Sequence, residues 1–309
     1  MAGLSKASPR FGLIGTISRD EIAYPDGRSF HQLGGILYQA AVLCGLGEET
    51  ALFANLSDDL APDVEDVISS WPTLKRHGIK RVPGPGNLVH LIYPDHGERR
   101  EVLESTVPAL DPALFSQSLL GLDLLVMVVN SGFDMALGDW RKIAAVAPCP
   151  IWFDIHSLTL KKVLGVQRDY LAVPEWKEWA RGATYLQANR QEVACMLGRP
   201  DSRATDAEVD RFGREALDEL GPGAVFVTLG KEGAMVAVPG RSERIGLSDT
   251  GQPVDTTGCG DAFCAAAVAR LARGASPAEA ATFGVSFASR AAMVSGVEKT
   301  YELALNEKQ

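Results

Sequence analysis

The sequence lacks the features that mark membrane, secreted and nucleic-acid-binding proteins. Its uninterrupted apolar runs, such as residues 124–129, are far shorter than the roughly 20 residues that a membrane-spanning helix needs. The 39 Asp and Glu residues outnumber the 30 Lys and Arg residues, and the net charge of −9 argues against a nucleic-acid partner. The first ten residues carry Lys6 and Arg10 and show no apolar core of a signal peptide. We therefore expect a cytoplasmic protein without a membrane or nucleic-acid partner.

Cysteines are also few. The five cysteines are odd in number and form no C-x-x-C pair, which argues against a disulfide framework and against a structural zinc site. Four of them lie in apolar or alanine-rich surroundings, where a cysteine is usually a small buried hydrophobe. The hydrophobic content of 46% and the charged content of 22% are ordinary for a globular protein.

Short apolar runs alternate along the chain with helix-like segments. This alternation predicts an α/β fold with a mostly parallel central sheet and helices on both faces. The expected strands are 11–17, 51–55, 122–129, 151–154, 184–187, 225–229 and 235–238. The expected helices are 36–46, 64–71, 140–146, 191–197, 206–220, 261–273 and 277–294. Since no internal repeat interrupts the pattern, a single domain over residues 1–309 is the simplest interpretation.

Two segments do not fit the alternation. Residues 19–33 are polar and turn-rich, while residues 87–103 alternate in polarity around a turn at Pro94-Asp95-His96-Gly97. Period-two patterning around a turn predicts a hairpin. We expect a small β flap formed by about 19–33 and 87–107. Two interpretations stay open, a lid that excludes water from a ligand and a solvent-facing excursion without a function.

The most informative segment is 255–263, with the sequence DTTGCGDAF, just before an alanine-rich expected helix. Gly258 and Gly260 flank a small residue at the helix N-terminus, where unpaired N–H groups and the helix dipole favour an anion. A carboxylate beside a bound anion would repel it unless the carboxylate had another role, so Asp261 is predicted to be a base. The simpler alternative is that Asp261 only complements the dipole and that the glycines form an ordinary loop.

This segment resembles the D-T-x-G-A-G-D signature of the ribokinase-like carbohydrate kinases, the phosphofructokinase B (PfkB) family. The one departure is Cys259, where the family usually has alanine. The resemblance implies a three-layer α/β/α fold with a small β lid and a need for ATP and Mg²⁺. It also implies that Asp261 is the catalytic base and that the N–H groups of Gly258, Cys259 and Gly260 form an anion hole. Because a helix N-terminus favours thiolate, we further hypothesise that Cys259 is reactive and that its modification blocks the anion site.

The N-terminal half supplies residues for a phosphate acceptor. Asp20 follows the first expected strand, and ligands bind beyond the carboxyl ends of strands in such sheets. Gly34 and Gly35 precede the expected helix 36–46, although a plain turn explains a glycine pair equally well. By the resemblance, Asp20, Gly34 and Gly35 hold acceptor hydroxyls together with Asp261. Gln39 stands where the family has an asparagine and is expected to bind the acceptor too.

Two further motifs resemble the family's donor site. Asn189 and Glu192 match its N-x-x-E motif, which implies that they influence Mg²⁺ and the transferred phosphate through water. Thr228, Gly230 and Gly233 match its T-x-G-x-x-G segment in the ATP pocket. The chain has no P-loop, since a valine stands where G-x-x-x-x-G-K needs its first glycine, and no G-x-G-x-x-G follows the first strand.

Departures from the family pattern lie on the acceptor side. The family often has D-x-N-x-R where residues 154–158 read DIHSL, and the stretch between Asp20 and Gly34 is short for a ribokinase, which implies a reduced lid. The resemblance also implies a monovalent-cation site for K⁺ near Asp255 and Thr257.

We therefore expect an ATP-dependent kinase that transfers the γ-phosphate to a hydroxyl of a small polyhydroxylated compound. A sugar is the first candidate for the acceptor, with a nucleoside or an inositol as alternatives. We also expect a homodimer that pairs through the lid. A second class of protein stays open, a catalytically silent binding protein with the kinase fold. An ADP-dependent sugar kinase is disfavoured by chain length.

A nucleoside acceptor needs an aromatic shelf for its base. The candidates are Tyr24, Phe30, Tyr38 and Tyr93, unless they form the lid core. The polar lid residues fit any acceptor and are His31, Asn87, His90 and Arg99.

Overall fold

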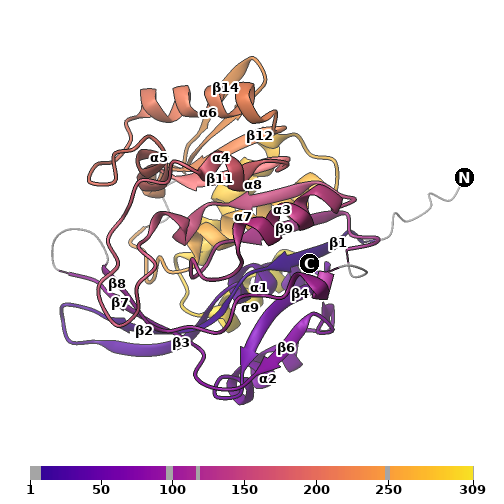
Figure 1. Cartoon of the computed structure of the whole chain (residues 1–309), viewed down its shortest axis with the longest axis vertical. Coiled ribbons are helices and arrows are strands. Elements are labelled where there is room, and N and C mark those ends of the chain that lie inside the picture. The colour runs from indigo at the N-terminus through magenta and orange to yellow at the C-terminus, as the bar shows by residue number, and fades with distance from the viewer. Residues whose placement is uncertain (1–7, 95–99, 116–118, 248–250, 309) are drawn as a thin grey trace, which may run out of the picture.

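The computed structural model describes residues 8–94, 100–115, 119–247 and 251–308 (Figure 1). Within these residues the main sheet has ten strands in the order β14-β13-β12-β11-β10-β9-β1-β4-β5, with β6 also paired to β4. The pairs are parallel except at the β12–β13–β14 end, where they are antiparallel. The strands are β1 (Arg10–Ile14), β4 (Glu49–Ser57), β5 (Leu74–Lys75), β6 (Ile79–Val82), β9 (Leu124–Val128), β10 (Ile151–Asp154), β11 (Tyr185–Asn189), β12 (Ala224–Thr228), β13 (Ala234–Val238) and β14 (Arg241–Ile245).

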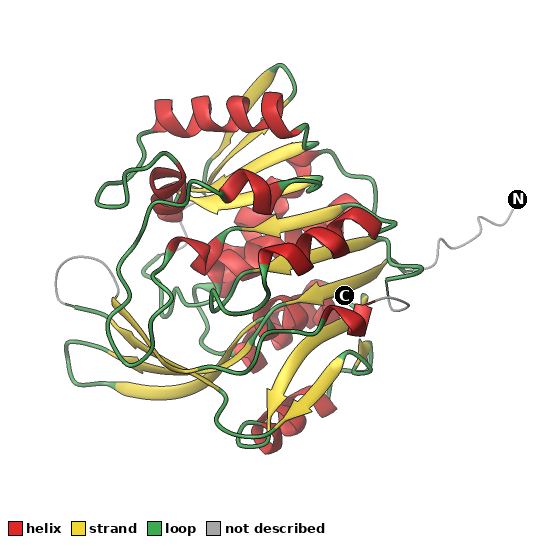
Figure 2. Ribbon diagram, in the orientation of Figure 1, coloured by secondary structure: helices red, strands yellow, loops and turns green. Residues whose placement is uncertain are grey.

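Two layers of helices cover the main sheet (Figure 2). One layer holds α1 (Leu37–Gly45), α2 (Ala61–Ser69), α7 (Cys259–Ala272), α8 (Pro277–Ala291) and α9 (Val297–Glu307). The other holds α3 (Leu137–Val146), α4 (Trp176–Ala180), α5 (Arg190–Met196) and α6 (Asp206–Leu220). Alternate residues of β4 divide between the two cores, with Leu52 and Ala54 on one side and Ala51 and Phe53 on the other. Burial on both faces explains the continuous apolar runs of these strands.

Helix limits follow from capping. The Thr205 hydroxyl and the Glu208 carboxylate form a capping box at the start of α6, and Gly221 ends that helix in a left-handed conformation. The expected helix 206–220 is therefore confirmed. The expected helix 277–294 is wrong at its end, because α8 stops at Ala291 and the polar helix α9 begins after Gly296. No helix in the described part of the chain combines the length and apolarity that crossing a bilayer requires.

A separate small sheet confirms the expected flap (Figure 1). Its strands, in spatial order, are β3 (Ser29–Gly35), β2 (Ile17–Ala23), β7 (Asn87–Ile92) and β8 (Arg100–Ser105). β2 and β3 pair antiparallel, β7 and β8 pair antiparallel, and β2 and β7 pair parallel. The expected turn around Pro94 lies partly outside the described residues, because 95–97 are not among them.

The first expected strand, 11–17, is wrong at its carboxyl end. β1 stops at Ile14, and the Thr16 N–H donates to the side chain of Asn130 at 3.0 Å instead of continuing the main sheet. Ile17 then begins β2, so Asp20 lies inside the small sheet and not at the end of a main-sheet strand. The small sheet thus starts directly at the carboxyl end of β1, where ligands bind in open α/β sheets.

Candidate active site

Three neighbouring cavities meet around the N-terminus of α7. The small-sheet cavity, about 600 Å³, lies beneath the small sheet, and the helix cavity, about 920 Å³, lies beside α7 and α8. The central cavity, about 690 Å³, lies between them and shares Asp261 and Gly258 with the first and Gly260 and Thr228 with the second.

Gly258 caps α7 in the conformation that the glycine-rich segment predicts. Its φ of 76° is left-handed, and a Cβ there would overlap the ring of Tyr38. The N–H groups of Gly258 and Gly260 donate to no acceptor in the described part of the chain, whereas the Cys259 N–H donates to the Thr256 carbonyl oxygen at 3.3 Å. The predicted anion hole therefore has two N–H groups available and one engaged within the loop.

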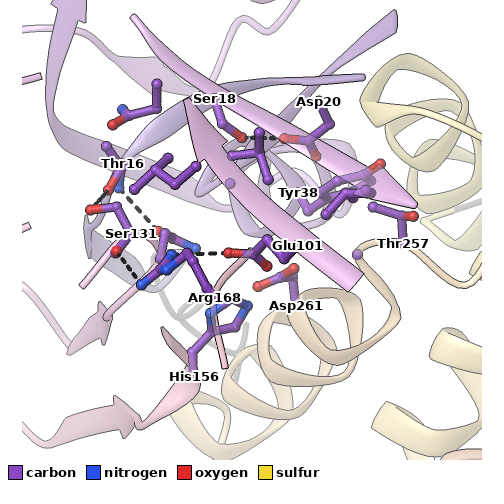
Figure 3. Close-up of a pocket in the computed structure, with 17 residues that line it drawn as sticks. Thr16, Ser18, Asp20, Tyr38, Glu101, Ser131, His156, Arg168, Thr257 and Asp261 are labelled. Carbon is purple, nitrogen blue, oxygen red and sulfur yellow. Dashed lines mark hydrogen bonds and ion pairs between the residues drawn. The ribbon is translucent and has the colours of Figure 1, made fainter. Parts of the chain in front are cut away.

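Asp261 lies in the first turn of α7 and faces the small-sheet cavity (Figure 3). It also lines the central cavity. Its Oδ1 accepts a hydrogen bond from the Gln39 side-chain N–H at 2.5 Å. Gln39 is completely buried and lines neither cavity, and its binding of the acceptor stays a prediction. Its side chain is longer than the family's asparagine and contacts the carboxylate of Asp261.

The buried carboxylate of Asp20 faces the small-sheet cavity from β2. The Ser18 hydroxyl donates to its Oδ1 at 2.7 Å, two residues earlier on the same face of the strand. Gly34 pairs with Ser18 across the strands, and a Cβ on Gly34 would overlap the Asp20 carboxylate. Gly35 lines the cavity itself, with a φ of 62°. Gly34 thus leaves room for Asp20, whereas a Cβ on Gly35 would overlap the Thr16 carbonyl oxygen.

Glu101 and Arg168 are cavity residues that sequence reasoning missed (Figure 3). Glu101 comes from β8, and Arg168 comes from the loop after β10, where it is completely buried. The Arg168 guanidinium donates to the Glu101 carboxylate at 2.9 Å. Burial lowers the pKa of Arg168 from its ordinary value, while Glu101 acts in the opposite direction. No local sequence pattern marks this pair, since 67 positions separate its members.

The N-x-x-E motif forms a capping box at the start of α5. The Asn189 side chain accepts from the Glu192 N–H at 2.9 Å, and Glu192 accepts from the Asn189 N–H at 2.7 Å. Both residues also line the central cavity with Asp154. Burial, followed by the charges of Glu192 and Asp261, raises the pKa of Asp154 well above its ordinary value. This acidic wall fits a divalent cation held through water.

His156 lies where the small-sheet cavity and the central cavity join. It is the one non-glycine residue with a positive φ, 40°, in the described part of the chain. Such strain collects at functional sites. The sequence flagged this position only as a departure from the family's asparagine.

The T-x-G-x-x-G segment lines the helix cavity as the resemblance implies. Thr228 ends β12, and Gly230 and Gly233 bound the short turn that follows. The remaining wall is mostly apolar and includes Leu247, Phe263, Val285, Ala292 and Met293. An apolar slot beside unpaired N–H groups fits a purine with its phosphates.

The predicted reactivity of Cys259 is wrong. Burial, together with the carboxylates of Asp255 and Asp261, raises the pKa of the Cys259 thiol to about 12. These effects outweigh the helix dipole, so the thiol stays protonated at neutral pH. Cys44, Cys195 and Cys264 are buried, in agreement with their expected role as small hydrophobes.

Asp255 and Thr257 lie together at the start of the glycine-rich segment. The Thr257 N–H and the Ser295 hydroxyl each donate to Asp255 at 2.8 Å. Across 8–94, 100–115, 119–247 and 251–308, no group of three His, Cys, Asp or Glu side chains has the arrangement of a metal site. The K⁺ site stays a prediction.

The aromatic residues of the flap mostly contact one another. Tyr24 stacks on Tyr93 with ring centroids 4.9 Å apart and also contacts Phe30, whereas Tyr38 lines the small-sheet cavity. His31 and His90 both contact Glu21. Asn87 lines the cavity and donates to the Ile17 carbonyl oxygen, and Arg99 lies outside the described residues. An aromatic shelf of all four residues is therefore not formed.

Sequence comparisons give a family and two partial relatives. Residues 155–302 match the pfkB family carbohydrate kinase model. The chain is 33% identical over 121 residues to the bifunctional protein HldE of Pseudomonas aeruginosa and 31% identical over 103 residues to the ribokinase of Schizosaccharomyces pombe. These alignments cover 38% and 33% of the chain, but only 25% and 32% of the two relatives.

Solved structures match nearly the whole chain. Arabidopsis thaliana ribokinase complexed with ribose and ATP superposes with a TM-score of 0.73 at 16% identity, over 98% of this chain and 99% of that one. Adenosine kinase of Sinorhizobium meliloti gives 0.75 at 20% identity, over 98% and 99%. A pyrophosphate-dependent kinase of the ribokinase family gives 0.78 at 13% identity, over 95% and 99%. The chain therefore has the ribokinase-like fold, and its residues 155–302 match the pfkB family carbohydrate kinase model.

Proposed function

We propose that this protein is an ATP-dependent kinase that phosphorylates a hydroxyl of a small polyhydroxylated compound, with a sugar as the first candidate. The observation that carries the proposal is the position of Asp261. Its carboxylate faces a cavity that holds Asp20 on one side and a cavity that holds the glycine-rich N-terminus of α7 on the other. A base between an acceptor site and an anion site is what transfer to an alcohol needs.

The chemical step follows from this placement. Asp20 accepts hydrogen bonds from the acceptor and orients one hydroxyl toward Asp261, which takes its proton. The hydroxyl oxygen then forms a bond to the γ-phosphorus as the bond to the β–γ bridging oxygen breaks, and ADP leaves. The N–H groups of Gly258 and Gly260 stabilise the charge on the phosphoryl oxygens. Glu192, which lines the central cavity, would hold Mg²⁺ through water, and the ion would supply positive charge for the phosphates.

The helix cavity supports ATP as the donor. Its apolar wall beside Thr228 and Gly233 suits a base, which pyrophosphate lacks. Pyrophosphate is the donor of one structural relative by its name, so the donor needs its own test. For the acceptor, the relatives include ribokinases and an adenosine kinase, and inositol belongs to the same chemical class.

We also propose that the small sheet is a lid on a single kinase domain and that its outer face pairs two copies of the chain. The face toward Asp261 carries alternate residues of β2, β7 and β8, among them Asp20, Val89 and Glu101. A roof over the reacting groups excludes water, which limits hydrolysis of ATP.

The test is ADP release from ATP with separate pools of sugars, nucleosides and inositols, repeated with pyrophosphate as the donor, followed by phosphate release, and with ADP as the donor, followed by AMP release. We expect ATP turnover that one pool stimulates, and the responding pool then names the acceptor class. Binding of a sugar without turnover of any donor would support the catalytically silent alternative. Turnover with pyrophosphate alone would support the kinase activity and reject ATP as the donor.

A further inference from the structure

The small-sheet cavity is acidic. Its lining carries three carboxylates, those of Asp20, Glu101 and Asp261, against the guanidinium of Arg168 and the imidazole of His156. The sum of these side-chain charges is negative whichever form the imidazole takes. An acceptor that enters this cavity therefore meets a field that favours neutral hydroxyls over a phosphate or a carboxylate.

Arg168 does not provide an anion site, because its hydrogen bonds are directed to the protein. Its Nε donates to the Lys161 carbonyl oxygen, one terminal nitrogen donates to Glu101 and the other to the Ser131 carbonyl oxygen, each at 2.9 Å. The side chain is completely buried, so a strong pairing with Glu101 replaces its hydration. The positive charge is therefore balanced before any acceptor binds.

The backbone fixes Glu101 in the same place. The Arg168 N–H donates to the Glu101 carbonyl oxygen and the Gly165 N–H donates to the Leu103 carbonyl oxygen, both at 2.9 Å. The loop after β10 thus extends the small sheet beyond β8 and attaches it to the main domain (Figure 1). Two attachments, backbone and side chain, hold the Glu101 carboxylate over the cavity that Asp261 faces.

We propose that the acceptor is an uncharged polyol, such as a free sugar, nucleoside or cyclitol, and that Glu101 is the specificity-determining residue that rejects phosphorylated and carboxylated analogues. Asp20 and Glu101 accept hydrogen bonds from hydroxyls, which the neutral acceptor supplies and an anionic group does not. The inference rests on the proposed function, since it assigns the acceptor of the same site.

Calorimetric titration of matched pairs tests the inference, with an ATP analogue that cannot transfer its phosphate present throughout. The pairs are ribose and ribose 5-phosphate, fructose and fructose 6-phosphate, inosine and its monophosphate, and inositol and its monophosphate. We expect the neutral member of the bound pair to bind on the order of 100-fold more tightly, as a fixed net negative charge at short range predicts. In Glu101→Gln this preference should fall about tenfold. The matched control is Glu104→Gln on the same strand, which is exposed and lines none of the three cavities and should keep the preference.

Each outcome of these titrations either supports or overturns the inference. A wild-type protein that binds the anionic member as tightly as the neutral one, or more tightly, overturns the inference, and this comparison needs no variant should Glu101→Gln fail to fold. An unchanged preference in a folded Glu101→Gln protein overturns the role of Glu101. In a parallel assay with ATP in place of the analogue, ADP release with an anionic acceptor would reject the inference and keep the kinase. Binding of a neutral compound without phosphate transfer from ATP would reject the proposed kinase activity and support the neutral ligand. Binding of no compound in any pair would reject both the proposed function and the inference.

Discussion

The hydrogen bond from Gln39 to Asp261 predicts that a residue outside the cavities controls turnover. Gln39→Leu keeps the side-chain volume and removes the donor that holds Oδ1 of Asp261 at 2.5 Å. It also removes the Gln39 side-chain oxygen, which is buried and has no hydrogen-bond partner within the described structure. The two losses act in opposite directions on stability, because an unsatisfied buried oxygen is itself destabilising.

The magnitude follows from this arrangement. A hydrogen bond to a charged group contributes about 1.5–3 kcal/mol, and the unsatisfied oxygen costs about 1–3 kcal/mol, so we expect the net change in unfolding free energy to be within about 2 kcal/mol. Catalysis has no such compensation, since the carboxylate loses its orientation. Misplacement of a catalytic group lowers kcat by roughly 10- to 100-fold, whereas KM for ATP should stay within about threefold because Gln39 does not line the helix cavity.

Steady-state ADP release and thermal unfolding of the same preparation test this prediction. The matched control is Asn55→Leu, because Asn55 is another buried amide whose nitrogen donates to a carbonyl, that of Pro108 at 2.9 Å, and whose oxygen has no partner within the described residues. Asn55 lies in β4 and lines none of the three cavities, so its variant should keep kcat. Normal kcat in Gln39→Leu, or an equal loss in both variants, would refute the positioning role.

Two further predictions come from the raised pKa values. The pKa of Asp154 is raised by burial and by Glu192 and Asp261. At pH values above the unfolded pKa of about 4, the folded protein therefore binds a proton that the unfolded chain does not, and stability falls as pH rises. In Asp154→Asn without Mg²⁺, the gain in Tm over wild type should be small near pH 4 and grow toward pH 8; a gain independent of pH would contradict this. The pKa of Cys259 is about 12, so iodoacetamide at pH 8 should modify it at least about 100-fold more slowly than free cysteine, as mass spectrometry can follow. Stoichiometric labelling within minutes would show that the thiolate forms after all.

The residues that the sequence identified belong to short motifs, and the structure brings them together. Asp261, Gly258 and Gly260 lie within four positions, and their helix N-terminus is a local property that composition and spacing reveal. Asn189 and Glu192 likewise form a local capping box. Such features are predictable because neighbouring residues determine them.

The residues that the sequence missed are joined only by the fold. Glu101 and Arg168 meet because a loop after β10 pairs with an edge of the small sheet, and no local pattern encodes that pairing. Asp20 was predicted as a site residue just after the first strand, but the end of that strand was placed too late, since the chain leaves β1 at a hydrogen bond from Thr16 to Asn130, more than a hundred positions away. Cys259 was misjudged because its burial and its acidic neighbours are tertiary effects that outweigh the helix dipole.

The central claim is that Asp261 is the base of a transfer from ATP to a hydroxyl. The most direct measurement is kcat for ADP release by Asp261→Asn with the acceptor pool that stimulates the wild-type protein. Asparagine keeps the shape and cannot take the proton, so we predict a fall of roughly 10² to 10⁴ in kcat with little change in KM for ATP. Near-normal turnover by this variant would contradict the account.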